Sequence, residues 1–202
     1  MQILRFESDD KKIYTGCHFD SPVDGQEALV IEGNIFSEFS VTQVKKQVER
    51  FLSPIVPSAI LCIGLNYRLH AKETGAELPK YPILFMKNPG AATGHLNPVQ
   101  IPSCCDRGPE LDYEAELAVI IKSPAKNVPL EKALDYVLGY SCANDISARK
   151  WQKNSGGGQW CRGKGFDTFC PFGPWIVTAD EIPNPNILDI ECVLNGRTMQ
   201  KS

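Results

Sequence analysis

The sequence lacks the patterns on which several large enzyme classes depend. It contains no GxSxG segment and no cysteine with a convincing catalytic partner, which argues against covalent serine or cysteine catalysis. It contains neither a GxGxxG loop nor a GxxxxGKS or GxxxxGKT loop, so nucleotide chemistry is not indicated. No apolar run is long enough to span a bilayer, and no internal repeat is visible.

Cysteine is frequent, yet CxxC pairs are absent among the eight cysteines. Several cysteines lie inside apolar, strand-like segments, as at 60–63, which is typical of reduced thiols in an intracellular protein. No Cys/His spacing fits a zinc site. Residues 1–6 soon become charged, so we expect no signal peptide and a cytoplasmic location.

Neither sign of charge is in large excess. The sequence contains 21 Lys and Arg residues and 24 Asp and Glu residues, which give a formal net charge of −3. This balance argues against nucleic acid or an anionic membrane as the main partner. The 202 residues are 43% hydrophobic, which is ordinary for a globular chain with one sizeable core.

Residues 1–57 are predicted to form a small N-terminal α+β domain. Segments 2–6 and 13–18 can make a hairpin around a polar turn, and 28–31 is a further strand candidate. Ser40 followed by Gln43 resembles a capping box, and the next valines recur at helical spacing, so we expect a helix over 40–52.

Residues 58–202 have a different sequence pattern, in which short apolar segments are separated by Gly and Pro. The predicted strands are 60–63, 83–86, 117–121, 136–142 and 175–177, and one helix is predicted over 130–138. This pattern indicates a β-rich α+β fold. Residues 155–158, which read Ser-Gly-Gly-Gly, suggest a mobile loop.

Three carboxylates stand out in this second region. Glu114 and Glu116 are two residues apart, so in an extended strand they project from one face, just before the apolar run 117–121, which we expect to be buried. Together with Asp145 they would form an all-oxygen site, which suits Mg²⁺, Mn²⁺ or Ca²⁺. The alternatives are an edge strand with two solvated glutamates, and an Asx turn at Asp145.

His70 and Glu73 are spaced three residues apart, which places both on one face of a short helix. A carboxylate beside an imidazole makes a competent general base. A surface ion pair is the alternative.

Several ordered motifs resemble the fumarylacetoacetate hydrolase family across about 59–200. They are the segments IGLNYRLHAKE (63–73), PILFMK (82–87), DYEAEL (112–117), GYSCANDISARKWQ (139–152), GKGFDT (163–168) and VLNG (193–196). The resemblance implies a mixed β-sandwich or roll with a small N-terminal domain, and a homodimer. It also implies a further C-terminal strand and loop after these motifs, which the sequence, ending at Ser202, does not contain.

The resemblance assigns roles to the candidate residues. Glu114, Glu116 and Asp145 become the metal ligands, and His70 and Glu73 become the base on a lid segment. Lys164 is the expected electrostatic partner of a developing enolate. The residues expected to contact substrate are Arg149, Gln152 and Lys87, although Arg149 could instead pair with Asp167 or Asp145.

The implied reaction is hydrolysis of a C–C bond in an acylpyruvate or β-diketo acid through a metal-stabilised enolate. The same enolate also serves oxaloacetate decarboxylation and keto–enol or double-bond isomerisation, so these reactions stay open. A non-catalytic homologue is the remaining alternative.

Overall fold

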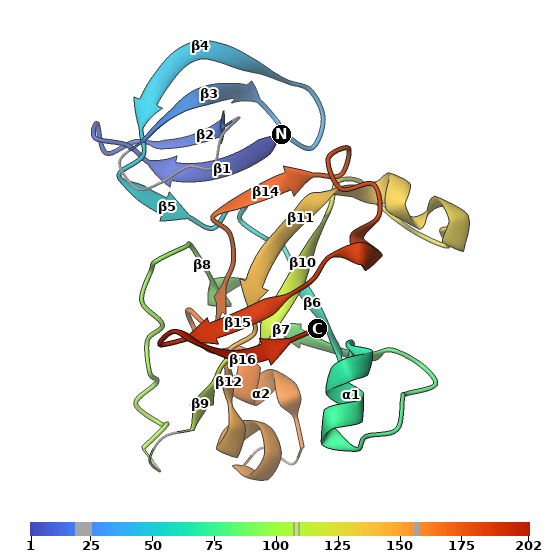
Figure 1. Cartoon of the computed structure of the whole chain (residues 1–202). Helices are drawn as coiled ribbons and strands as arrows, with labels where there is room; N and C mark the ends of the chain where they lie inside the picture. Colours follow the sequence, from blue (N-terminus) through green and yellow to red (C-terminus); the bar gives the residue numbers. More distant parts are fainter. Residues whose placement is uncertain (19–25, 107, 109, 156–157) are drawn as a thin grey trace.

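One antiparallel sheet of eight strands runs through most of the molecule (Figure 1). The computed structural model describes residues 1–18, 26–106, 108, 110–155 and 158–202. The sheet order is β10-β11-β14-β1-β2-β3-β4, and β5 pairs with β1 beside this path. These strands are β10 (Ala115–Ile121), β11 (Val137–Asn144), β14 (Trp175–Thr178), β1 (Gln2–Glu7), β2 (Ile13–His18), β3 (Glu27–Gly33), β4 (Phe39–Gln47) and β5 (Arg50–Leu52). The predicted β-rich α+β fold is confirmed.

Four two-stranded sheets surround this main sheet. They are β6 (Ile60–Gly64) with β7 (Ile83–Lys87), β8 (Ala92–Thr93) with β13 (Cys170–Pro171), β9 (Leu111–Asp112) with β12 (Ser147–Ala148), and β15 (Glu191–Leu194) with β16 (Arg197–Lys201). Only the β8–β13 pair is parallel.

Helices are short. They are α1 (Arg68–Thr74), α2 (Trp160–Lys164), the 3₁₀ helices η1 (Pro89–Ala91), η2 (Leu130–Tyr136) and η4 (Pro185–Ile187), and the π-helical turn η3 (Trp151–Ser155). Among the described residues, no helix combines the length and the apolarity that a membrane span requires. The loop expected over 155–158 lies partly outside the described residues.

The N-terminal strands join the rest of the chain through β1. The expected hairpin is present as β1 and β2, in register from Gln2↔His18 to Glu7↔Ile13. On its other side β1 pairs with β14, with Ile3 opposite Ile176. The strands on the two sides of residue 57 therefore share one sheet, and the division into two domains there stays a prediction.

The predicted helix over 40–52 is wrong, because this segment forms β4 and β5. β-Branched residues fit a strand better than a helix, and β3 offers a ladder for them, with Val41 opposite Ile31. The Thr42 hydroxyl donates to the Val30 carbonyl oxygen at 2.9 Å, and this side-chain hydrogen bond further links β4 to β3. Tertiary pairing outweighs the local capping signal.

Two further expectations need correction. The helix expected over 130–138 is the 3₁₀ helix η2, and β11 begins already at Val137. Strand β10 is not buried on both faces, since Val119 is 48% and Ile121 52% exposed while Ile120 is buried. The reason is topological, because β10 is the last strand at its end of the main sheet.

The main core lies where the N-terminal strands meet β10 and β14. Its buried members are Ile3, Cys17, Ile31, Ile120 and Ile176. A second cluster lies next to the carboxylate region, and its members are Ala91, Ile146, Ala148, Phe169 and Cys170. Ile146 and Ala148 flank Ser147, so packing of this cluster fixes the backbone that carries polar groups of the site.

We expect Ile176→Ala to lower the free energy of unfolding by about 2–5 kcal/mol, because the side chain is fully buried in the core and its loss leaves a cavity. Urea denaturation followed by circular dichroism measures the change. The control Val56→Ala, at a side chain that is 75% exposed, should change stability by less than about 0.5 kcal/mol. Equal losses in the two variants would contradict the assignment of this core.

Candidate active site

The candidate site is built around one carboxylate held by two buried lysines. Lys87 Nζ from β7 donates to Asp145 Oδ1 in a short contact, and also to the Ile146 carbonyl oxygen at 3.0 Å. Lys164 Nζ at the end of α2 donates to Asp145 Oδ2 at 2.9 Å. Both lysine side chains are almost fully buried. Buried ammonium groups are tolerated only when they are paired, and Asp145 is the carboxylate that both lysines share.

The pairing of β10 with β11 brings the other carboxylates to this point. Their register places Ala115 opposite Asn144, and just beyond it the Asp145 N–H donates to the Glu114 carbonyl oxygen at 2.9 Å. Lys164 Nζ then reaches Glu114 Oε2 at 2.9 Å as well. Lys164 therefore bridges two of the three carboxylates that the sequence singled out.

Ser147 completes the contacts of the ammonium group. Its hydroxyl accepts from Lys164 Nζ at 2.6 Å and donates to Glu114 Oε1 at 3.1 Å. Ser147 belongs to β12 and is fully buried. Lys164 thus has three oxygen partners, which matches its three N–H donors.

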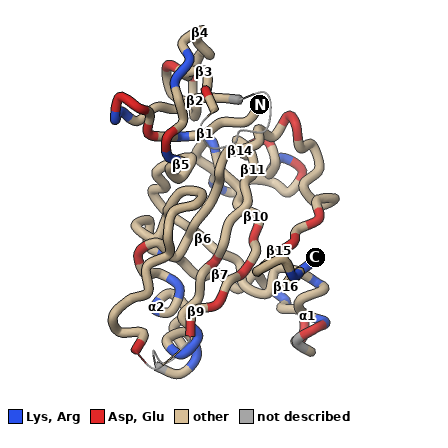
Figure 2. The backbone as a smooth tube through the Cα atoms, turned by 60° about the vertical axis from the view of Figure 1, so that its left-hand side comes forward, with Lys and Arg blue, Asp and Glu red and all other residues tan. Residues whose placement is uncertain are grey.

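Arg149 links the cluster to a second layer of polar groups. Its Nη1 lies 2.7 Å from Glu114 Oε1 and 2.9 Å from Gln152 Oε1, and its Nη2 lies 2.7 Å from Asp112 Oδ2. The pairing that the sequence suggested as an alternative, with Asp145 or Asp167, is replaced by these partners. Figure 2 shows the acidic positions of β9 and β10 on the part of the molecule that carries the basic positions near α2.

Glu114 and Asp145 each form an ion pair with a Lys or Arg side chain, whereas Glu116 forms none among the described residues. Burial raises the pKa of Glu114, but Lys164 and Arg149 outweigh it and hold the pKa below its usual value. Burial raises the pKa of Glu116 to about 7, and the nearby charge of Glu114 adds to the rise. Within the described part of the chain, no Lys or Arg forms an ion pair with Glu116; its hydrogen-bond partner is the Tyr67 hydroxyl.

The type of these donors fits a hard divalent cation. Glu114, Glu116 and Asp145 are all oxygen ligands, and their mutual repulsion is the condition that a bound cation relieves. In the described ranges, however, no group of three His, Cys, Asp or Glu side chains is arranged as a metal site. The Lys164 ammonium instead lies between Glu114 and Asp145, so metal ligation by these residues stays a prediction.

His70 and Glu73 lie elsewhere. Both are exposed on α1, and none of the described contacts that hold the lysine–carboxylate cluster comes from either side chain. Helix α1 is nevertheless tied to the site at its first turn, because the oxygen of Tyr67, the N-cap residue, accepts from the Leu117 N–H at 3.1 Å. The role of the His70–Glu73 pair as a base stays a prediction.

Sequence reasoning missed three residues that the structure brings to the site. Asp112 precedes Glu114 by two positions, so the same period-two spacing that singled out Glu114 and Glu116 could have found it. Ser147 and Tyr67 lie inside the quoted motifs but carry no local signal of their contacts. Their partners are distant in sequence and are set by strand pairing.

A strand-rich fold with a buried lysine–carboxylate cluster defines a class of site suited to stabilising negative charge on oxygen. Residues 59–202 match the family model of the fumarylacetoacetate hydrolase C-terminal region. The chain belongs to this family, as its motifs predicted.

Relatives in other organisms support the assignment. An uncharacterised protein from Archaeoglobus fulgidus is 44% identical over 95% of this chain and 68% of its own length. A mitochondrial oxaloacetate tautomerase from Xenopus laevis is 46% identical over 75% of this chain. The match spans only 47% of the length of that tautomerase.

Solved structures show the same fold. The 5-carboxymethyl-2-hydroxymuconate delta-isomerase from Mycobacterium smegmatis superposes with a TM-score of 0.84 at 33% identity, covering 100% of this chain and 75% of the isomerase. A fumarylacetoacetate hydrolase from Exiguobacterium antarcticum gives a TM-score of 0.82 at 32% identity, with 100% and 75% coverage.

We expect Lys164→Met to lower the free energy of unfolding by about 3–5 kcal/mol at pH 7, because it leaves Glu114 and Asp145 buried without their shared cation. Urea denaturation measures the loss. The double variant Lys164→Met/Glu114→Gln should recover part of it, since one of the unpaired charges is gone. A neutral effect of Lys164→Met would mean that the ammonium does not hold this cluster together.

Proposed function

We propose that this protein catalyses proton transfer on 2-oxo acids, interconverting their keto and enol forms through a stabilised enolate. The observation that carries this proposal is the position of Lys164, whose buried ammonium is fixed by Glu114, Asp145 and Ser147. A donor held in advance where negative charge develops stabilises an enolate without reorganisation during the reaction.

The surrounding groups suit the acid end of such a substrate. Arg149 carries a guanidinium on the accessible side of the cluster, with its side chain about 30% exposed. A planar guanidinium matches a carboxylate, so Arg149 would bind the substrate carboxylate. The buried positive charge of Lys164 would stabilise the negative charge that develops on the C2 oxygen. Gln152 accepts from Arg149 Nη1 at 2.9 Å and keeps the guanidinium oriented.

Glu114, Glu116 and Asp145 would hold the divalent cation, with Mg²⁺, Mn²⁺ and Ca²⁺ as the candidates. A bound cation would supply Lewis-acid polarisation of the substrate carbonyl. The lack of a Lys or Arg partner for Glu116 among the described side chains supports this part of the proposal, because a bound cation would supply the missing positive charge. The homodimer and the cytoplasmic location stay predictions.

Two of the similar proteins have names that describe the same chemistry. They are an oxaloacetate tautomerase and a hydroxymuconate isomerase, whereas the similar structure from Exiguobacterium antarcticum is named a hydrolase. The described cluster holds the parts that enolate stabilisation needs. Tautomerisation therefore takes precedence over the C–C hydrolysis that the sequence favoured.

Hydrolysis of an acylpyruvate remains the second candidate. The observation in its favour is the contact of Tyr67 with strand β10, which ties the helix bearing His70 and Glu73 to the edge of the site. In this reaction His70 would take a proton from water, the water oxygen would bond to C4, and the C3–C4 bond would break. The electron pair would remain on C3 as the enolate of pyruvate, which is then protonated.

We expect the purified protein, supplied with Mg²⁺, to accelerate ketonisation of enol oxaloacetate and of enol acetylpyruvate, followed by loss of enol absorbance. Lys164→Met should lower kcat/KM by at least about 100-fold, because it removes the buried positive charge that would stabilise the enolate. The exposed-lysine control Lys72→Met should leave the rate unchanged.

The variant His70→Ala separates the two candidate functions. Tautomerisation predicts that ketonisation rates stay within about twofold of the unmodified protein, whereas hydrolysis predicts loss of pyruvate release from acetylpyruvate. No ketonisation and no pyruvate release in the unmodified protein would overturn both candidates and favour a non-catalytic homologue.

A further inference from the structure

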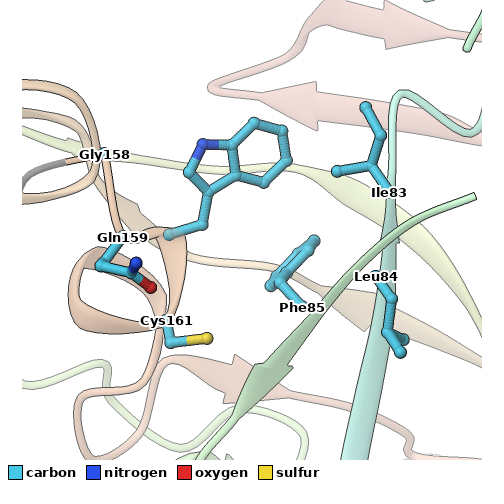
Figure 3. Close-up of a pocket in the computed structure, with 7 residues that line it drawn as sticks. Ile83, Leu84, Phe85, Gly158, Gln159 and Cys161 are labelled. Atoms are coloured by element: carbon cyan, nitrogen blue, oxygen red, sulfur yellow. The ribbon is translucent and has the colours of Figure 1, made fainter.

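A hollow of about 240 Å³ is lined in part by Phe85, whose ring centroid lies 5.2 Å from Lys164 Nζ of the charged cluster. Its lining residues are Ile83, Leu84 and Phe85 of β7, and Gly158, Gln159, Trp160 and Cys161 around the start of α2. Figure 3 shows Phe85 on one side of the hollow and Gln159 with Cys161 on the other. None of these lining residues carries a charge.

An aromatic pair forms the floor of the hollow. The rings of Phe85 and Trp160 are 5.5 Å apart between centroids and meet edge to face, at 69° between planes. Gly64 of β6 makes room for this arrangement, because a Cβ at its position would overlap the six-membered ring of Trp160. The glycine thus serves a close approach of an aromatic ring.

The hollow and the charged cluster are built by the same two elements. On β7, Phe85 and Lys87 are two residues apart and both buried, so they lie on one face of the strand. On α2, Trp160 and Lys164 are four residues apart, which places them on one side of the helix. Lys164 Nζ lies 5.2 Å from the centroid of the Phe85 ring. Each element therefore contributes one lysine to the cluster and one aromatic residue to the hollow.

We propose that the hollow binds the non-reacting end of the substrate, and that the preferred substrates are 2-oxo acids with an aromatic or branched aliphatic end group. This inference rests on the proposed function, since it takes the charged cluster as the site of the acid end. An apolar cavity of about 150 Å³ is enough to hold benzene, so a phenyl group fits.

A second carboxylate would be poorly placed here. Oxaloacetate carries a charge at each end, and the hollow offers no Lys, Arg or His among its lining residues to neutralise the far one. Burying a carboxylate that has no cationic partner is unfavourable. The geometry therefore favours monoanionic substrates with an apolar end over short dianions.

The test compares two ligands that share the reacting head and differ only at the end group. We expect benzoylpyruvate to bind at least about tenfold more tightly than acetylpyruvate in calorimetric titrations with Mg²⁺ present, because the phenyl group buries more apolar area than the methyl group. Trp160→Ala should remove most of this preference and leave the affinity for acetylpyruvate within about twofold.

Two further variants distinguish loss of the Trp160 ring contact from a general folding defect. Trp160→Phe keeps an aromatic ring and should retain most of the preference for benzoylpyruvate. Gly64→Ala pushes the Trp160 ring aside and should reduce the preference without removing any lining atom. Ile187→Ala, at an exposed position outside the hollow, is the matched control and should behave like the unmodified protein.

The outcomes separate this inference from the proposed function. Equal affinity for the two ligands would overturn the inference alone, and so would a preference for benzoylpyruvate that survives Trp160→Ala. Binding of neither ligand would overturn both the inference and the proposed function. Ketonisation of acetylpyruvate without any preference for benzoylpyruvate would support the proposed function and contradict the proposal that the hollow binds the end group of the substrate.

Discussion

The carboxylate of Asp145, shared by the ammonium groups of Lys87 and Lys164, is the interaction on which the rest of the site depends. Asp145 is the carboxylate partner of buried Lys87, and for buried Lys164 it acts together with Glu114. Because Lys87 lies on β7, Lys164 on α2 and Asp145 just after β11, one carboxylate joins three segments that are distant in sequence. The strand pairing of β10 with β11 then sets Glu114 within reach of the same ammonium.

Proteins similar to this chain are named tautomerase, isomerase and hydrolase. All three reactions benefit from a positive charge held beside the oxygen of an enolate. In this chain the Phe85 ring, which lines the hollow, lies 5.2 Å from Lys164 Nζ, whereas His70 and Glu73 are exposed on α1.

Much of the site could be predicted because its members lie in short motifs with clear spacing. Period-two spacing singled out Glu114 and Glu116, and motif order added Asp145 and Lys164. The same spacing could also have found Asp112, whereas the contacts of Ser147 and Tyr67 could not be predicted, because strand pairing sets them.

The helix expected over 40–52 failed for a similar reason. The local signal favoured a helix, but the open edge of β3 offered backbone partners that a lone segment cannot reveal. The exposure of β10 likewise depends on its place at the end of the sheet, which composition alone does not give.

The most direct test of the account is a calorimetric titration of the protein with Mg²⁺ in the presence of oxalate, which mimics the enolate of a 2-oxo acid. The account predicts saturable binding that weakens at least about tenfold in Glu116→Ala. It predicts no change in Glu77→Ala, at an exposed glutamate on the surface. Absence of binding in the unmodified protein, or equal binding in Glu116→Ala, would contradict the central claim that these carboxylates form a cation site beside Lys164.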